Sequence, residues 1–101
     1  MLVVGLGGTF KPVDGRIAEI ERMYVRPAAQ GLGVGRALLT RLLQEARAES
    51  YATVRLETLR FMTTAQAMYR ATGFVDTAPF NGSEVAGTAL EPYVRFMAFP
   101  L

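Results

Sequence analysis

The segment with the clearest chemical potential is QGLGVG, residues 30–35, which places three glycines directly before apolar residues at helical spacing. When such a loop leads from a strand into a helix, its backbone N–H groups converge on an anion, and the helix dipole favours the negative charge. A Cβ at Gly33 or Gly35 would hold a phosphate away from these amides. A flexible loop or a tight helix start is the alternative, but either needs only one or two glycines. The pattern therefore favours an anion site.

Two common phosphate-binding motifs do not fit this segment. A Walker loop needs Lys and then Ser or Thr after its last glycine, whereas Arg36 follows Gly35. A dinucleotide fingerprint needs a third glycine where this sequence has Leu38, and the earlier glycine pair at 5–7 fails in the same way at Phe10. An NTPase or a dinucleotide-binding protein is not indicated, and these residues alone leave the anion open.

The composition restricts the remaining chemistry. The chain has 101 residues with no cysteine and no histidine, so we expect one domain, residues 1–101, with a single modest core. These absences remove thiolate nucleophiles, Ser-His-Asp arrangements and most transition-metal sites, and we expect no metal. Acid–base work falls to Asp, Glu, Tyr, Arg, Lys or water.

The charge and the opening segment bear on partners and location. Arginines such as Arg36, Arg41 and Arg47 are interleaved with acidic residues, and no module of stacking aromatics is evident, so nucleic acid is not expected as a partner. Arginine does suit carboxylate and phosphate. Residues 2–10 are apolar but contain three glycines and follow no basic stretch, which argues against a signal peptide or a membrane span. We expect a cytoplasmic protein.

Strands and helices alternate along the chain in a pattern that predicts an α/β fold. The expected elements are strands over 2–10 and 16–26, a helix from 33 or 34 to 49, a strand over 53–59, a helix over 63–73, and strands over about 74–80 and 93–99. Thr63 with Gln66 predicts a capping box, and Gly73 predicts a left-handed helix end followed by the apolar contact of Phe74. The order is β-β-α-β-α-β-β.

Three segments together carry a resemblance to a known family. They are Gln30, Gly33 and Gly35 in the pattern Q/R-x-x-G-x-G/A, residues 18–20 with 23–25, and AMYRATGF at 67–74. The chain resembles the GNAT superfamily of acetyl-CoA-dependent N-acetyltransferases over essentially its whole length. The resemblance implies a mixed, mainly antiparallel sheet with two helices, and it implies acetyl-CoA as cosubstrate.

The resemblance also implies which residues bind the cosubstrate. The pantetheine arm would lie along the central strand like an added strand and bond backbone groups at Met23, Tyr24 and Val25. Gln30 would brace the loop, and Tyr69 would also contact the cosubstrate. The pyrophosphate would be held by backbone amides around the glycines and the helix start: Gly31, Leu32, Gly33, Val34, Gly35 and Arg36.

Two catalytic roles follow from the resemblance. Tyr69 occupies the position of a general acid that protonates the leaving thiolate, where a phenol of pKa ~10 meets a thiol of pKa ~8.5. Packing within the helix is the alternative for this aromatic residue. Glu19 occupies the position of a general base that takes a proton from the attacking amine, directly or through water. Glu21 is the competing carboxylate, and Met62 replaces an Asn found in many members.

The expected activity is transfer of an acetyl group from acetyl-CoA to a primary amine by direct attack, and the expected acceptor is the amine of a small molecule or of a peptide. A non-catalytic CoA-binding or remnant domain is the alternative, because members usually carry a strand, two helices and another strand before the segment that matches residues 2–10. Those helices form much of the acceptor pocket. An apolar strand edge at 2–6 and uncovered faces would then favour a two-fold homodimer.

Overall fold

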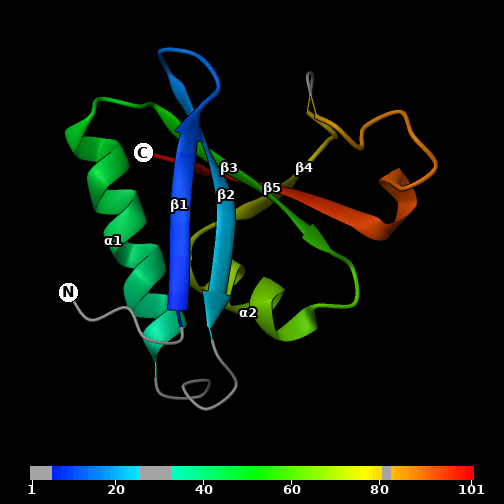
Figure 1. Ribbon diagram of the computed structural model, residues 1–101, viewed down its shortest axis with the longest axis horizontal. Coiled ribbons are helices and arrows are strands. Elements are labelled where there is room, and N and C mark those ends of the chain that lie inside the picture. Colours follow the sequence, from blue (N-terminus) through cyan, green and yellow to red (C-terminus); the bar gives the residue numbers. More distant parts are fainter. Residues whose placement is uncertain (1–5, 26–32, 81–82) are drawn as a thin grey trace.

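The structure is a computed structural model that describes residues 6–25, 33–80 and 83–101 (Figure 1). A five-stranded sheet in the order β1-β2-β3-β5-β4 carries two α-helices. Among the described strands, only β2 and β3 pair in parallel, so the predicted mixed, mainly antiparallel α/β fold is confirmed. The elements are β1 (Leu6–Pro12), β2 (Ile17–Val25), α1 (Val34–Ala48), β3 (Thr53–Leu59), α2 (Thr63–Thr72), β4 (Val75–Thr77), a 3-10 turn (Glu91–Tyr93) and β5 (Val94–Pro100).

The last two predicted strands differ most from the structure. The strand expected over 74–80 shrinks to β4, because Pro79 has no N–H to donate and the chain leaves the ladder after Thr77. Tyr93, expected in the final strand, belongs to the 3-10 turn that precedes β5. The predicted residues 2–5 and 26 lie outside the described residues. Predicted and observed bounds agree for β3 and closely for α1.

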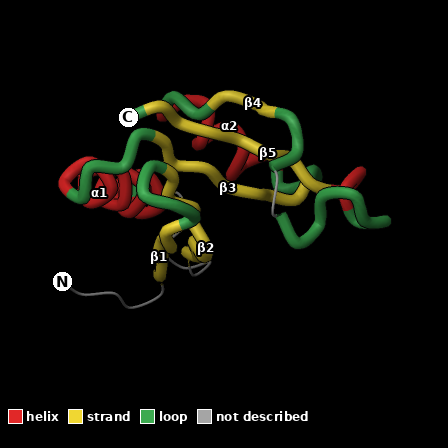
Figure 2. The backbone as a smooth tube through the Cα atoms, turned by 90° about the horizontal axis from the view of Figure 1, so that it is seen from above, coloured by secondary structure: helices red, strands yellow, loops and turns green. Residues whose placement is uncertain are grey.

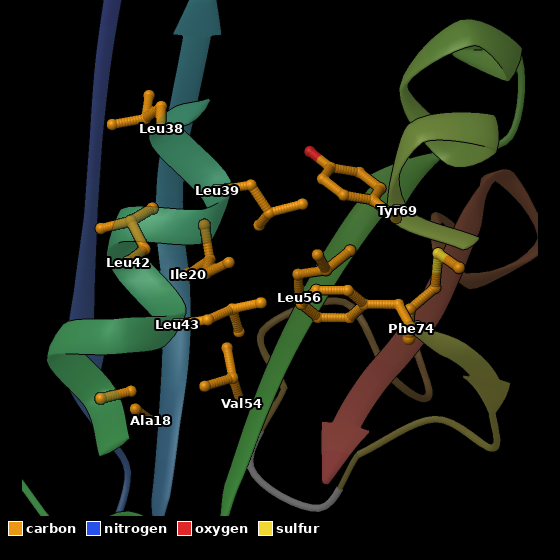
Figure 3. Close-up of a cluster of buried hydrophobic side chains, with 12 residues drawn as sticks. Ala18, Ile20, Leu38, Leu39, Leu42, Leu43, Val54, Leu56, Tyr69 and Phe74 are labelled. Carbon is orange, nitrogen blue, oxygen red and sulfur yellow. The ribbon is translucent and has the colours of Figure 1, made fainter. Parts of the chain in front are cut away.

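The core forms where α1 packs on one face of the sheet. Leucines at helical spacing line the inner side of α1. Tyr69 approaches the same cluster from α2, and Phe74 approaches it from the segment that follows α2 (Figure 3). The buried members from α1 and the sheet are Leu38, Leu39, Leu42, Leu43, Ala46, Ala18, Ile20, Val54, Leu56 and Met97. Because side chains alternate along a strand, this burial directs the neighbours of Ala18 and Val54 to the opposite face.

The two ends of α2 show one wrong prediction and one confirmed prediction. The capping box is wrong: Met62 is the N-cap without a side-chain hydrogen bond, and buried Gln66 instead donates Nε2 to the carbonyls of Leu59 and Arg60, each at 2.9 Å. Gly73 ends the helix at a φ of 125°, as predicted, and a Cβ there would lie 2.7 Å from the Phe99 ring. The conformation and the close approach both require glycine.

The β1–β2 hairpin turns away from the rest of the sheet. Viewed from above, β3, β5 and β4 run across the picture, while β1 and β2 lie to one side and are seen nearly end-on (Figure 2). The β2–β3 ladder has only three residue pairs, Ile17 with Thr53, Ala18 with Val54 and Glu19 with Arg55. The β1–β2 ladder, by contrast, extends to Val25, and its register shifts at Glu21, which has no paired residue in β1.

Candidate cosubstrate and catalytic site

The divergence of β2 from β3 leaves backbone groups available at the centre of the sheet. Glu19 and Arg55 form the last parallel pair, and β2 continues to Val25 without pairing to β3. Met23, Tyr24 and Val25 occupy this final stretch, where β1 pairs with one edge of the strand. The other edge has no partner strand among the described residues. This free edge is where an added strand could bond.

The start of α1 is a helix N-terminus without a cap. Gly33 is the N-cap residue at φ 76° and ψ 7°, no side chain caps the helix, and its first turn contains no acidic residue. The first intrahelical bond joins the Ala37 amide to the Gly33 carbonyl at 3.1 Å, which leaves the amides of Val34, Gly35 and Arg36 without helical acceptors. Such amides and the helix dipole favour an anion.

The structure gives a conformational reason for glycine at position 33. A Cβ added there would meet nothing within 4 Å, so the positive φ, which L side chains adopt at a cost, is the local requirement. The preceding residues of the predicted loop, Gln30, Gly31 and Leu32, lie outside the described residues. Their assignment stays a prediction.

Tyr69 is buried between the helices. Its side chain is 8% exposed, its ring lies 5.8 Å from that of Phe74, and its hydroxyl points toward Leu39 of α1 (Figure 3). Burial disfavours the phenolate and raises the pKa of Tyr69 above its usual value of 10.0. The part of the chain that the structure describes gives this hydroxyl no hydrogen-bond partner. The aromatic ring thus packs in the core while the hydroxyl keeps its proton and its donor capacity.

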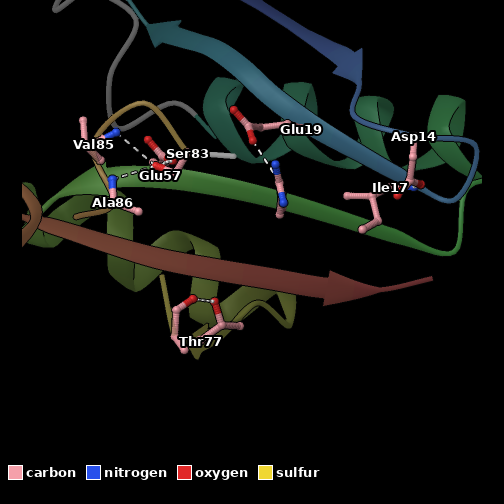
Figure 4. A network of polar contacts seen from close by, with 10 residues as sticks. Asp14, Ile17, Glu19, Glu57, Thr77, Ser83, Val85 and Ala86 are labelled. Atoms are coloured by element: carbon pink, nitrogen blue, oxygen red, sulfur yellow. Dashed lines mark hydrogen bonds and ion pairs between the residues drawn. The ribbon is translucent and has the colours of Figure 1, made fainter. Parts of the chain in front are cut away.

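Glu19 is held in an ion pair on the opposite face of the sheet. Arg55 Nε donates to Glu19 Oε1 at 2.9 Å, and the two side chains are 10% and 16% exposed, respectively (Figure 4). The Arg55 guanidinium in turn lies 4.4 Å from the ring centroid of Phe80. The sequence analysis missed both of these residues. The only signal was the alternation of β3, which directs Arg55 away from the core.

A second polar contact ties a loop to this same face. Ser83 Oγ donates to Glu57 Oε2 and accepts the amides of Val85 and Ala86 at 3.2 Å (Figure 4). Glu57 follows Arg55 by two positions in β3 and therefore shares its face. The structure thus brings Glu19 together with Arg55 and places the loop after β4 nearby, but it places Tyr69 on the other side of the sheet.

The comparisons with known proteins agree with this geometry. Residues 3–74 match the Acetyltransferase (GNAT) family. The chain belongs to this family. Among GNAT relatives, it is 42% identical over 79 residues to the IAA acetyltransferase of Azospirillum brasilense, covering 78% of this chain and 52% of that protein. The chain therefore spans about half the length of that relative.

Solved GNAT structures share the fold. A protein from Klebsiella pneumoniae, provisionally named an acyl-CoA N-acyltransferase, has a TM-score of 0.83 and 29% identity, covering 93% of this chain and 61% of that one. YncA from Salmonella typhimurium, provisionally named an acetyltransferase and solved with its cofactor acetyl-CoA, has a TM-score of 0.74 and 27% identity. That match covers 96% of this chain and 58% of YncA.

Two further observations concern this GNAT chain within its described ranges. No group of three or more Asp or Glu side chains there is arranged to hold a metal ion. No helix in residues 6–25, 33–80 and 83–101 is long and apolar enough to cross a membrane.

Proposed function

We propose that this chain transfers an acetyl group from acetyl-CoA to a primary amine by direct attack. The observation that carries the proposal is the opening between β2 and β3 at the end of the molecule where the uncapped α1 begins (Figure 1). Family membership and the acetyl-CoA in the related YncA structure support the choice of cosubstrate.

The residues present fit this cosubstrate. Backbone groups at Met23, Tyr24 and Val25 would bond the pantetheine amides along the free edge of β2. The amides of Val34, Gly35 and Arg36, which have no helical acceptors, would bind the pyrophosphate together with the loop of Gln30, Gly31, Leu32 and Gly33. When bound, acetyl-CoA supplies the thioester carbon that the amine nitrogen attacks as the carbon–sulfur bond breaks.

The two proton transfers of the reaction would use residues on opposite faces of the sheet. Tyr69 approaches from the helix side and keeps its proton because burial raises its pKa, so it can donate that proton to the departing sulfur. Glu19 lies on the other face and would take the amine proton, directly or through water. Arg55 holds one of its carboxylate oxygens, which leaves Oε2 for this role.

Acetyl-CoA binding is tested by Gly35→Glu. Acetyl-CoA at about 100 times its dissociation constant should stabilise the wild type by ~2.7 kcal/mol, which raises Tm by about 10 °C or more. Glutamate in the first turn of α1 suits the helix dipole and removes a helical glycine, so this variant should fold at least as stably as wild type. Its negative charge should nevertheless abolish the shift with acetyl-CoA.

Gly15→Glu is the matched control, because Gly15 lies in the exposed turn between β1 and β2 and a Cβ there meets nothing within 4 Å. This control should keep the full shift with acetyl-CoA. An unchanged Tm of the wild type with acetyl-CoA would reject the proposal. A shift without turnover on any member of a panel of primary amines would favour the CoA-binding alternative.

The proposed assembly is a two-fold homodimer. β1 is an edge strand of the sheet, and an exposed edge with free N–H and C=O groups favours pairing with a second chain. The apolar residues 2–5, on which the sequence argument rests, lie outside the described residues.

A further inference from the structure

The Glu19–Arg55 ion pair depends on a guanidinium group that is itself held by few contacts. Arg55 is 9% exposed, and Nε is its one guanidinium nitrogen that bonds within the described residues, at 2.9 Å from Glu19 Oε1. A single hydrogen bond leaves the guanidinium plane free to turn about it. A second contact is therefore needed if the Glu19 carboxylate is to keep one orientation.

The ring of Phe80 supplies this second contact. Its centroid lies 4.4 Å from Arg55 Cζ, within the range of a cation–π interaction. Arg55 is almost fully buried, so little water competes for its charge, and a cation–π contact is stronger when the cation is desolvated. The planar guanidinium also suits stacking on an aromatic face. Phe80 thus restrains the guanidinium independently of the hydrogen bond to Glu19.

Phe80 is in turn anchored to the sheet. It packs against Phe96 of β5, with ring centroids 5.2 Å apart at an angle of 84°, the edge-on arrangement that aromatic pairs favour. Phe96 is 4% exposed and pairs with Glu57 of β3, so it shares a face of the sheet with Glu57 and Arg55. The segment after β4 thus reaches the ion pair through an aromatic residue with a fixed support.

A second carboxylate on this face is an alternative partner for Arg55. Glu57 follows Arg55 by two positions in β3, a separation of about 7 Å along the strand. Ser83 donates to Glu57 Oε2, but Oε1 accepts no hydrogen bond from the described residues (Figure 4). A guanidinium without the restraint of Phe80 could turn from Glu19 toward Glu57. The proposed base would then lose its orientation.

We propose that Phe80 is a positioning residue for the proposed base: its ring holds Arg55 in the ion pair, and Arg55 in turn orients the Glu19 carboxylate. The effect on catalysis rests on the function proposed above, whereas the restraint on Arg55 does not. Glu19 ends the β2–β3 ladder and so lies where the strands diverge. The loop after β4 thereby acts on proton removal from the amine through Phe80.

The first test measures the restraint by NMR and needs no activity. The Arg55 Nε–Hε signal, assigned by its absence in Arg55→Lys, should exchange slowly with water and should shift in Glu19→Gln. Phe80→Leu keeps an apolar side chain without a π face, and it should speed this exchange about tenfold or more. Phe80→Tyr should retain slow exchange. Phe61→Leu, the same substitution at a residue 75% exposed before α2, should not alter it.

The second test is a double-mutant cycle on acetyl transfer. Phe80→Leu should lower kcat about tenfold and leave the KM for acetyl-CoA unchanged, and Phe80→Tyr should restore most of kcat. In a Glu19→Gln background, Phe80→Leu should have no further effect on kcat, because the group that it positions is already gone. A residue that served packing alone would lower kcat by the same factor in both backgrounds.

Unchanged exchange of the Arg55 signal in Phe80→Leu would overturn the proposal, as would an unchanged kcat or equal losses of kcat in both backgrounds. Wild-type turnover by Glu19→Gln would reject Glu19 as the base while acetyl transfer itself stands. If the wild type transfers no acetyl group, the function proposed above fails, and the exchange rates alone decide whether Phe80 restrains Arg55. If circular dichroism shows that Phe80→Leu does not fold, Phe80→Met replaces it with the same expectations.

Discussion

Replacing Tyr69 by phenylalanine separates the structural role of this residue from its proposed chemical role. The ring packs against Phe74 in the core, while the described residues offer the hydroxyl no hydrogen bond. Tyr69→Phe therefore removes only a buried oxygen and keeps the apolar contacts. A residue that served packing alone would tolerate this change in every assay.

The expected magnitudes follow from that environment. A side chain 8% exposed gains little from a hydroxyl without a partner, so the free energy of unfolding should stay constant or rise by up to ~1 kcal/mol. Loss of the general acid should slow turnover about 10²-fold, equivalent to ~2.7 kcal/mol of transition-state stabilisation. The dissociation constant of acetyl-CoA should change little.

Three measurements are needed: urea unfolding, calorimetric titration with acetyl-CoA, and the rate of acetyl transfer to an accepted amine. Tyr93→Phe is the matched control, because Tyr93 is 63% exposed and lies in the 3-10 turn before β5. It should match the wild type in all three.

The pH dependence of stability provides a further check. Because burial raises the pKa of Tyr69 above 10.0, the unfolded chain loses this proton first as the pH rises. The unfolded state then binds fewer protons, so the free energy of unfolding should fall above about pH 10, and Tyr69→Phe should lessen that fall.

Two outcomes would contradict these expectations for Tyr69. Equal turnover by wild type and Tyr69→Phe would show that the residue only packs, and a large loss of stability would show that its hydroxyl is bonded.

Three other predictions concern the fold and its assembly. In Gly33→Ala the added Cβ meets no atom, but the alanine must adopt a positive φ, so the free energy of unfolding should fall by about 1 kcal/mol. In Gly73→Ala the added Cβ also lies 2.7 Å from the Phe99 ring, so the free energy of unfolding should fall by about 2 kcal/mol or more. Thermal unfolding measures both. Gln66→Leu leaves two backbone carbonyls without their donor and should cost about 1–3 kcal/mol in urea unfolding. Sedimentation at micromolar concentration should show a dimer, and a species with the mass of one chain would contradict that prediction.

Local sequence patterns predicted α1 and β3, the helix and the strand that each bury one face. The leucines of α1 recur at helical spacing, and β3 alternates apolar residues with polar ones, so both elements could be bounded from the sequence. Gly73 was also readable, because a helix that ends before Gly-Phe commonly closes in a left-handed conformation. Each of these signals lies within a few residues of the feature it predicts.

The features that the sequence analysis missed depend on partners distant in the chain. Arg55 bonds Glu19 across 36 positions, and no local pattern marks that contact. Gln66 has the spacing of a capping box, yet its side chain turns to carbonyls of the segment that precedes the helix. The local preference was outweighed because burying Gln66 beside those carbonyls satisfies its amide group.

The same burial pattern constrains how the proposed reaction can proceed. Ala18 and Ile20 must lie under α1, and alternation then sends Glu19 to the opposite face, away from Tyr69. In a closed ladder, the sheet would separate the proposed base from the proposed acid. Here the pairing of β2 with β3 stops at Glu19, so a thioester between the diverging strands would be open to both faces. The proposed catalysis therefore depends on this opening of the sheet, and not on direct contact between Glu19 and Tyr69.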